Sequence, residues 1–267
     1  MVESAGLEVR GLCKSYGGLQ ALADLSFSVQ PGECVALIGP NGAGKSTTFA
    51  CIAGQQTPSG GHVVWNGRSL AGLSPLHRLR QGMARTFQVA QTFESLTLLQ
   101  NVLLLLPGAN VLNPLQVLGL NAFSRATELL VRVGLQEQSD QTAGSLPYGA
   151  KKRLELAMAL AGLEGRGEQP ALLLLDEPAA GLAAAERAAL MQLVHGLTRA
   201  RAGQGRLAVL YTEHNMDAVF GFADRVLVLM QGKLAAMGTA QEVAANALVR
   251  SQYLGRSFAL NSKAPHA

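Results

Sequence analysis

A glycine-rich stretch at residues 39–47 constrains the fold of this chain more than any other feature. It reads Gly39, Pro40, Asn41, Gly42, Ala43, Gly44, Lys45, Ser46 and Thr47. This matches Gly-x-x-x-x-Gly-Lys-Ser/Thr, the pattern of loops whose backbone N–H groups surround phosphate oxygens. Apolar residues 34–38 before it predict a buried strand. Residues 47–53 after it predict a helix, whose N-terminus favours anions.

Two side chains of this stretch have expected roles. Lys45 is expected to reach the β and γ phosphates of a nucleotide, and the Ser46 hydroxyl is expected to ligate Mg²⁺. The alternative is a turn without a ligand, in a chain that contains 30 glycines. The order of strand, loop and helix favours the phosphate-binding interpretation, which leaves open what the nucleotide's energy is used for.

Length and composition bound the class of protein. The 267 residues suffice for one large α/β domain, or for a core with a subdomain. Only 15% of them are charged, below the roughly 25% of ordinary domains, which favours a large core and apolar surface for partners. The longest apolar runs, 102–106 and 171–175, are far shorter than the ~20 residues of a membrane span. With no signal-peptide pattern visible, we expect a chain on the cytoplasmic side.

Charge and cysteine content narrow the class further. The net charge is +4, without a dense Lys/Arg stripe interleaved with aromatics, so no nucleic-acid partner is expected. The cysteines Cys13, Cys34 and Cys51 have no ligand-like spacing. They are expected to be reduced cysteines of the core.

The pattern of apolar residues divides the chain into three parts. Residues 7–16, 19–29 and 62–65 predict strands of a β-rich opening. The middle is leucine-rich and helix-like. Later segments alternate between strand and helix, which predicts parallel pairing with covering helices. We expect a nucleotide-binding core with a β subdomain at 1–88 and 164–255, a helical subdomain at 89–163, and a flexible tail at 256–267.

Two adjacent carboxylates, Asp176 and Glu177, follow the apolar run at residues 172–175. This places two carboxylate side chains at the carboxyl edge of a parallel sheet, where ligands of such sheets bind. Asp176 would hold the Mg²⁺ shell, and Glu177 would polarise an attacking water. The alternative is an exposed acidic pair at a strand end, which the phosphate-type loop disfavours.

Three weaker signals lie elsewhere. Lys151, Lys152 and Arg153 stand at the start of a helix predicted to begin near Ala150, and three cations there oppose the helix dipole. Either an anion or acidic surface lies in front of them, or they are solvated. His214 follows the strand predicted at residues 207–212, where it could contact a γ-phosphate or be structural. Gln88 could reach the metal or the water.

Together these segments resemble the ATP-binding subunit of an ABC transporter, over about residues 7–255. Within that superfamily the chain is most similar to subunits of branched-chain amino acid importers. The resembling pieces are 84–88, 146–149, 213–217 and 253–255. The resemblance implies a RecA-like P-loop NTPase core with an antiparallel β subdomain and an inserted α-helical subdomain.

The resemblance also implies residue roles. Residues 39–47 would be the Walker A loop, and Asp176 with Glu177 the end of Walker B. Gln88 would link the Mg²⁺ site to the helical subdomain, and His214 would be the switch histidine. Tyr16 would stack on adenine, unless it is an ordinary strand aromatic.

The signature position shows departures from the family pattern. Pro147 and Gly149 would cap the γ-phosphate held by a second subunit, but Pro147 replaces the usual serine and has neither a hydroxyl nor an N–H. Tyr148 replaces a glycine and Ala150 a glutamine, while Ala183 stands where Asp or Asn is usual. These differences bear on signalling between subunits rather than on ATP binding.

The resulting hypothesis is a transport ATPase at the cytoplasmic face of the membrane, using ATP and Mg²⁺. Its expected partners are a second ATPase subunit, identical or different, transmembrane permease subunits and, indirectly, a solute-binding protein. Phe93, Leu96 and Leu98 could contact the permease or belong to the core. Alternatives are an amide or urea importer, a lipid exporter, an ABC ATPase of DNA repair or translation, or a phosphotransferase.

Overall fold

The computed structural model describes residues 6–108, 120–199 and 206–255. Among these residues, six strands form a sheet of order β10-β9-β3-β8-β7-β6. All neighbouring pairs are parallel except β9 and β10, which are antiparallel. The bounds are β3 (Cys34–Ile38), β6 (Met83–Arg85), β7 (Ala171–Asp176), β8 (Leu207–Thr212), β9 (Arg225–Met230) and β10 (Lys233–Gly238).

Both faces of the central strands β3, β7, β8 and β9 are covered, which explains why these strands are mostly apolar. Alternate residues point to opposite faces of a strand. In β3, Cys34, Ala36 and Ile38 belong to one core cluster, while Val35 and Leu37 belong to the other. The first cluster packs against helices, and the second against α1 (Lys45–Ala53) and a further sheet.

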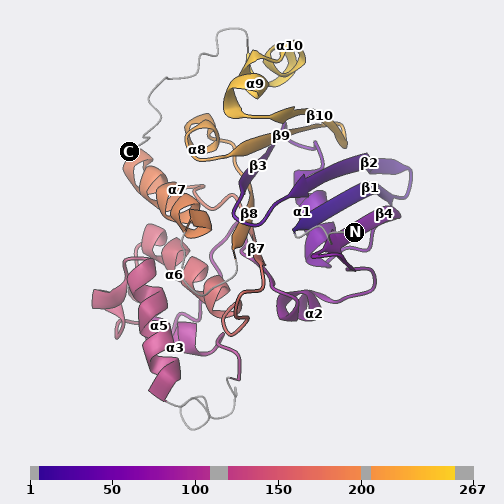
Figure 1. Ribbon diagram of the computed structural model, residues 1–267. Helices are drawn as coiled ribbons and strands as arrows, with labels where there is room; N and C mark the ends of the chain where they lie inside the picture. The colour runs from indigo at the N-terminus through magenta and orange to yellow at the C-terminus, as the bar shows by residue number, and fades with distance from the viewer. Residues whose placement is uncertain (1–5, 109–119, 200–205, 256–267) are drawn as a thin grey trace.

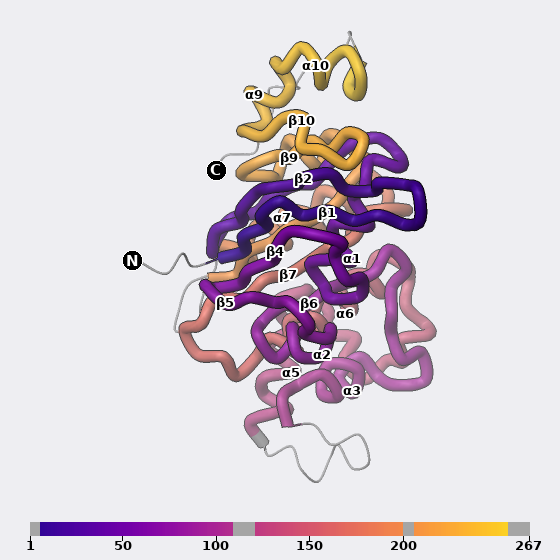
Figure 2. Tube along the Cα trace, turned by 90° about the vertical axis from the view of Figure 1, so that its right-hand side faces the viewer, coloured from indigo at the N-terminus to yellow at the C-terminus, as the bar shows by residue number. Residues whose placement is uncertain are grey.

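That further sheet is antiparallel and has the order β2-β1-β4-β5 in the described chain. It lies across one side of the molecule, as Figure 2 shows. Its strands are β1 (Leu7–Tyr16), β2 (Leu19–Val29), β4 (Gly60–Trp65) and β5 (Arg68–Ser69).

The remaining helices pack mainly on the other side (Figure 1). α3, α5 and α6 lie together at one end, and α9 and α10 at the other. The bounds are α2 (Pro75–Arg80), α3 (Leu98–Leu103), α5 (Leu120–Arg132), α6 (Tyr148–Ala161), α7 (Ala184–Arg199), α8 (Met216–Phe220), α9 (Ala240–Ala245) and α10 (Ala247–Val249). Short turns are η1 (Gln136–Gln138), η2 (Ala143–Ser145) and η3 (Arg250–Leu254).

Helix α1 is fixed at its C-terminal end by a buried arginine of α2. Arg78 is 5% exposed, and its guanidinium donates to the carbonyl oxygens of Cys51 (2.8 Å) and Ile52 (2.6 Å). It also donates to those of Leu70 (2.9 Å) and Leu73 (3.1 Å). A helix leaves its last carbonyl groups without partners, and a cation there also favours the helix dipole. Arg78 therefore ties α2 to the helix that follows the glycine-rich loop.

Some of the secondary-structure elements predicted from the sequence match the structure, and others differ from it. The strands predicted at 7–16, 19–29 and 207–212 have those bounds in the structure, and the α/β class is confirmed. The helix predicted near Ala150 begins two residues earlier, at Tyr148. The division into subdomains stays a prediction, and the expected tail at 256–267 lies outside the described residues.

Candidate functional site

The glycine-rich loop connects β3 to α1, as the pattern predicts. Its glycines Gly39, Gly42 and Gly44 have φ of 148°, 78° and 104°, values that side-chain-bearing residues rarely adopt. A Cβ on Gly39 would lie 2.1 Å from the carbonyl oxygen of Leu229 in β9. Close packing against β9 and positive φ therefore both require glycine, and the loop is held against the sheet edge.

Lys45 lies over this loop. Its side chain is buried, and Nζ donates to the carbonyl oxygens of Gly39 (2.6 Å) and Pro40 (3.1 Å). Burial lowers the pKa of Lys45, while the nearby carboxylates of Glu177 and Asp176 act in the opposite direction. The ammonium group is thus placed between the loop and the acidic strand end.

The carboxyl ends of β7 and β8 bring the predicted carboxylates to the same edge. The two strands pair in register, with Asp176 opposite Thr212. The Thr212 hydroxyl donates to Asp176 Oδ1 (2.9 Å) and accepts from the backbone N–H of Glu177 (3.0 Å). One hydroxyl therefore fixes both acidic residues.

Asp176 has a second partner on the neighbouring strand β6. Arg85 Nη2 donates to Asp176 Oδ2 at 2.8 Å, and both side chains are mostly buried. The same guanidinium donates to Gln55 Oε1 and lies over the rings of Phe49 and Phe87. Arg85 thereby joins β6 and α1 to the acidic end of β7.

Glu177 lies between the two polar residues that the sequence placed near it. Gln88 Nε2 donates to Glu177 Oε2 at 3.0 Å, and His214 Nε2 lies 2.9 Å from Oε1. Glu177 has φ of 49°, a left-handed conformation that costs a residue with a side chain about 1–2 kcal/mol. Such strain gathers at functional sites, where the surrounding contacts maintain it.

The loop after β7 is tied to the loop after β8 by Glu213. This carboxylate is 3% exposed, and it accepts from the N–H groups of Ala179 (2.8 Å) and His214 (3.2 Å). Burial raises the pKa of Glu213, and those N–H groups oppose the rise. Glu213 thus orders the segment that carries His214.

The start of α6 carries the residues of the expected signature position. Pro147 is its N-cap, with no side-chain cap bond. A Cβ on Gly149 would lie 3.1 Å from Glu186 Oε1, so a side chain there would be tight. The Tyr148 hydroxyl donates to the carbonyl oxygen of Gln88 at 3.4 Å. No described hydrogen bond joins Pro147 or Gly149 to residues 39–47.

Two of the cations at the start of α6, Lys151 and Lys152, have different surroundings. Lys151 pairs with the exposed carboxylate of Glu94 at 2.9 Å. Lys152 is 4% exposed and turns inward against residues 87 and 88. Of the two alternatives, solvation is therefore wrong for Lys152, which has Glu155 Oε2 at 3.8 Å and donates to carbonyl oxygens of the adjacent loop.

The two remaining residues of the predicted site are Tyr16 and Ser46. Tyr16 ends β1, is 44% exposed and has the Lys14 ammonium 4.8 Å from its ring centroid. Within the described ranges no hydrogen bond or ring contact joins Tyr16 to the loop. Ser46 is an exposed residue at the N-terminal end of α1, as its predicted role requires.

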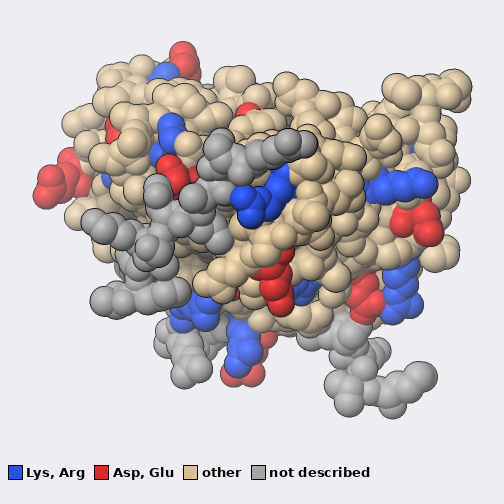
Figure 3. Space-filling view, turned by 90° about the horizontal axis from the view of Figure 1, so that it is seen from above, with Lys and Arg blue, Asp and Glu red and all other residues tan. Residues whose placement is uncertain are grey.

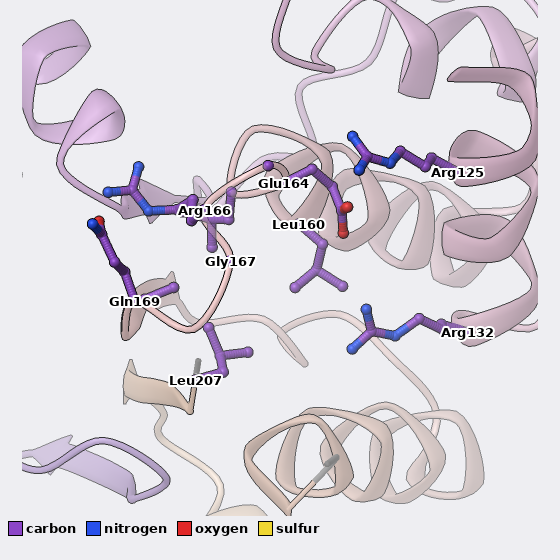
Figure 4. Close-up of a pocket in the computed structure, with 11 residues that line it drawn as sticks. Arg125, Arg132, Leu160, Glu164, Arg166, Gly167, Gln169 and Leu207 are labelled. Atoms are coloured by element: carbon purple, nitrogen blue, oxygen red, sulfur yellow. The ribbon is translucent and has the colours of Figure 1, made fainter. Parts of the chain in front are cut away.

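A separate pocket lies at the opposite edge of the sheet, beside the first residues of β7 and β8, Ala171 and Leu207. Figure 4 shows Arg125 and Arg132 of α5 pointing toward Leu160 and Glu164 there. None of the predicted site residues lines this pocket. The carboxyl edge therefore remains the candidate site.

The glycine-rich loop of residues 39–47 has the phosphate-binding pattern and precedes a helix, and it lies beside an acidic strand end of a parallel sheet. This combination defines a P-loop nucleoside triphosphatase. The family model described as "ABC transporter" matches residues 22–180. The chain belongs to the ABC transporter family.

Known proteins agree with that membership. The chain is 36% identical over 260 residues to the high-affinity branched-chain amino acid transport ATP-binding protein LivG of Salmonella typhimurium, covering 94% of this chain and 98% of LivG. It is 34% identical over 252 residues to the lipopolysaccharide export system ATP-binding protein LptB of Acidithiobacillus ferridurans, covering 94% and 98%. A crystal structure of an ABC transporter ATP-binding cassette in its ADP conformation superposes with TM-score 0.79 at 28% identity, covering 94% and 98%.

The sequence-based predictions of the family, of its fold and of an ATPase coupled to transport are confirmed. Sequence reasoning gave no role to Thr212 and cited Arg85 only within a resembling piece. Thr212 could have been noticed, because it is a polar residue ending an apolar strand, as Asp176 does. Arg85 gave no such signal, since its partner lies 91 positions away.

We predict that Thr212→Val lowers the ATP turnover rate about tenfold or more, the usual effect of losing a partner that orients functional groups. The substitution removes the hydroxyl that holds both Asp176 and Glu177. Steady-state phosphate release measures the effect. Thr198→Val is a matched control, because that hydroxyl donates to His195 within α7. Equal activity of the two variants would contradict the role given to Thr212.

Proposed function

We propose that this chain is the ATP-hydrolysing subunit of a membrane importer and acts as one half of an ATPase dimer. The observation that carries the proposal is the Glu177 carboxylate, held between Gln88 (3.0 Å) and His214 (2.9 Å) at the carboxyl edge of the sheet. A carboxylate in that place suits the activation of a water that attacks a terminal phosphate.

ATP is bound through the loop of residues 39–47 in this proposal. The N-terminus of α1 presents N–H groups to the phosphates, and its dipole favours their charge. Lys45 exchanges the carbonyl oxygens of Gly39 and Pro40 for phosphate oxygens, which leaves its ammonium paired with an anion instead of a dipole. Tyr16 is the proposed support of the adenine ring, because the family resemblance gives it that role and the residue is 44% exposed.

Mg²⁺ is the proposed metal, and the donor set suits it. Ser46, Asp176 and Gln88 offer hydroxyl, carboxylate and amide oxygens, the hard donors that Mg²⁺ takes together with phosphates and water. The metal, when bound, neutralises charge on the β and γ phosphate oxygens. Asp176 is held for this role by Thr212 and Arg85.

The proton of the attacking water goes to Glu177 in the proposed mechanism. The Gln88 amide and the His214 ring hold the two carboxylate oxygens, so that the carboxylate has one orientation. The N–H of Glu177 bonded to Thr212 maintains the left-handed backbone that directs the side chain. After hydrolysis the proton leaves with the phosphate.

The second ATPase subunit, identical or different, supplies the other side of the nucleotide site. Pro147 and Gly149 would face the γ-phosphate of that partner. Pro147 offers no donor, so we assign the contact to the N–H groups of Tyr148 and Gly149, since those of Ala150 and Lys151 already donate to the Pro147 carbonyl oxygen.

The transmembrane permease is proposed to bind at an apolar groove of about 400 Å³. Leu76 (56% exposed) and Phe93 (50% exposed) lie at its rim, and Met158 of α6 lines it. Of the two alternatives for Leu98, the core role holds, because this residue is fully buried in α3. No helix in the described ranges is both long and apolar enough to cross a bilayer.

Branched-chain amino acids are the proposed cargo, imported with the help of a solute-binding protein. The support is the similarity to LivG, at 36% identity over nearly the whole chain. LptB, at 34%, keeps lipid export as the alternative. Import of amides or urea is the other alternative, since the cargo does not touch this subunit.

Function outside transport has less support. On the face in Figure 3, Lys and Arg side chains are interspersed with Asp and Glu rather than gathered in one patch. A nucleic-acid surface would present a basic stripe. We propose a peripheral subunit at the cytoplasmic face of the membrane, supported by the similarity to subunits of membrane transporters.

We predict that Glu177→Gln lowers ATP turnover by at least about a hundredfold, the usual contribution of a positioned general base. The amide keeps the shape of the side chain and cannot take the proton, so ATP stays bound and holds the dimer together. Phosphate release and size-exclusion chromatography with ATP measure the two effects. Wild-type phosphate release by this variant would contradict the assignment.

We predict that Leu76→Glu reduces the amount of permease that copurifies with the chain by about tenfold or more, as expected for a buried charge at an interface. The exposed Leu248 of α10 does not line the groove, so Leu248→Glu is the control. Equal copurification of both variants would place the permease elsewhere.

Uptake into vesicles tests the cargo. Vesicles that contain this chain, its permease and the solute-binding protein are expected to accumulate leucine with ATP, and not to do so with Glu177→Gln. Uptake of urea in place of leucine would reject the cargo and retain the motor.

A further inference from the structure

We propose that Lys152 and Glu155 of α6 are positioning residues for ATP hydrolysis, which act by fixing the backbone that carries Gln88. The inference deepens the proposed function and rests on it, because Gln88 matters only if Glu177 activates water. Lys152 and Glu155 lie three residues apart on α6, both buried, with exposed fractions of 4% and 5%.

The loop of residues 86–91 has irregular backbone. Buried backbone groups need partners, and a segment outside helices and sheets must take them from side chains or water. Glu155 Oε1 accepts from the N–H groups of Phe87 (3.0 Å) and Gln91 (3.5 Å). Lys152 Nζ donates to the carbonyl oxygens of Phe87 (3.1 Å) and Gln88 (2.7 Å). The two side chains thus bind the loop before and after Gln88.

The Gln88 carbonyl oxygen is held from a second point on α6. The Tyr148 hydroxyl donates to it at 3.4 Å, and the Lys152 ammonium lies 5.8 Å from the Tyr148 ring centroid. Tyr148 is the first residue of α6 and follows Pro147. The helix end that faces the partner subunit and the residue that touches Glu177 are therefore joined by direct contacts.

The two charged groups are separated by 3.8 Å between Nζ and Oε2, longer than a hydrogen bond. Their shorter contacts go to the loop backbone instead. Burial lowers the pKa of Lys152 and raises that of Glu155, and each group's charge counteracts the change in the other. A buried ion pair of this kind contributes little stability compared with apolar residues, so stability alone does not account for it.

The contacts of Lys152 and Glu155 with the loop fix the position of Gln88 relative to Glu177. Gln88 Nε2 lies 3.0 Å from Glu177 Oε2, and small displacements of positioned groups lower catalytic rates strongly. Because the loop is held by α6, a movement of α6 on dimer closure would move Gln88 with it. Lys152 and Glu155 touch neither the reacting atoms nor the phosphate loop within the described contacts.

A double-mutant cycle tests the proposal. Lys152→Met is expected to lower kcat at least about tenfold, with a change in the KM for ATP below about threefold, because positioning is lost and binding is kept. Gln88→Ala is expected to lower kcat as well. In the Gln88→Ala background, Lys152→Met is expected to cause no further loss, since Lys152 acts through Gln88.

Lys151→Met is the matched control, because the neighbouring lysine pairs with the exposed Glu94 outside the loop. It is expected to leave kcat unchanged. If Lys152→Met does not fold, Lys152→Arg keeps the charge with a different shape, and its smaller loss of kcat must also vanish in the Gln88→Ala background.

Additive losses in the cycle would overturn the proposal, because a purely structural lysine would lower activity whatever residue stands at 88. A Lys152→Met enzyme with wild-type kcat would also overturn it. Glu177→Gln distinguishes failure of the proposed function from failure of the role given to Lys152. If Glu177→Gln keeps full turnover, the proposed function fails; if it loses turnover and the cycle is additive, only the role of Lys152 fails.

Discussion

The in-register pairing of β7 with β8 is the constraint on which the site depends. It sets Asp176 opposite Thr212, so that one hydroxyl reaches both the carboxylate and the following N–H. A shift of one residue would turn every side chain of the strand to the other face. The fully buried leucines of β7 lie in two different cores, which fixes this register. The packing of the β7 leucines in the two cores thereby decides where the acidic groups lie.

The polar contacts at the sheet edge form one connected set. Arg85 joins β6 to Asp176, Glu213 joins the loops after β7 and β8, and Glu177 accepts from Gln88 while lying against His214. Polar groups that are partly shielded from water cost free energy when they lose a partner. Their shared partners mean that the site is built as a unit, and that one lost group leaves others unsatisfied.

Much of the architecture could be predicted from the sequence because its signals are local. The loop of residues 39–47 and the pair Asp176–Glu177 each follow an apolar strand, and the strands at 7–16 and 19–29 alternate clearly. The three-residue β6 was not predicted, since so short a strand has no periodicity of its own. Lys152 could not be distinguished from Lys151, because only tertiary packing turns one inward and leaves the other at the surface. The start of α6 was missed by two residues because the N-cap is Pro147, which gives no side-chain cap bond.

Arg78 connects two distant parts of the molecule. Its guanidinium joins α2 to the last carbonyl groups of α1, while Leu76 of the same short helix stands at the rim of the apolar groove. α1 begins at Lys45 beside the phosphate-type loop. Hydrogen bonds of Arg78 therefore connect the rim of the groove to α1, the helix that begins at the glycine-rich loop, so a displacement of α2 would also displace α1.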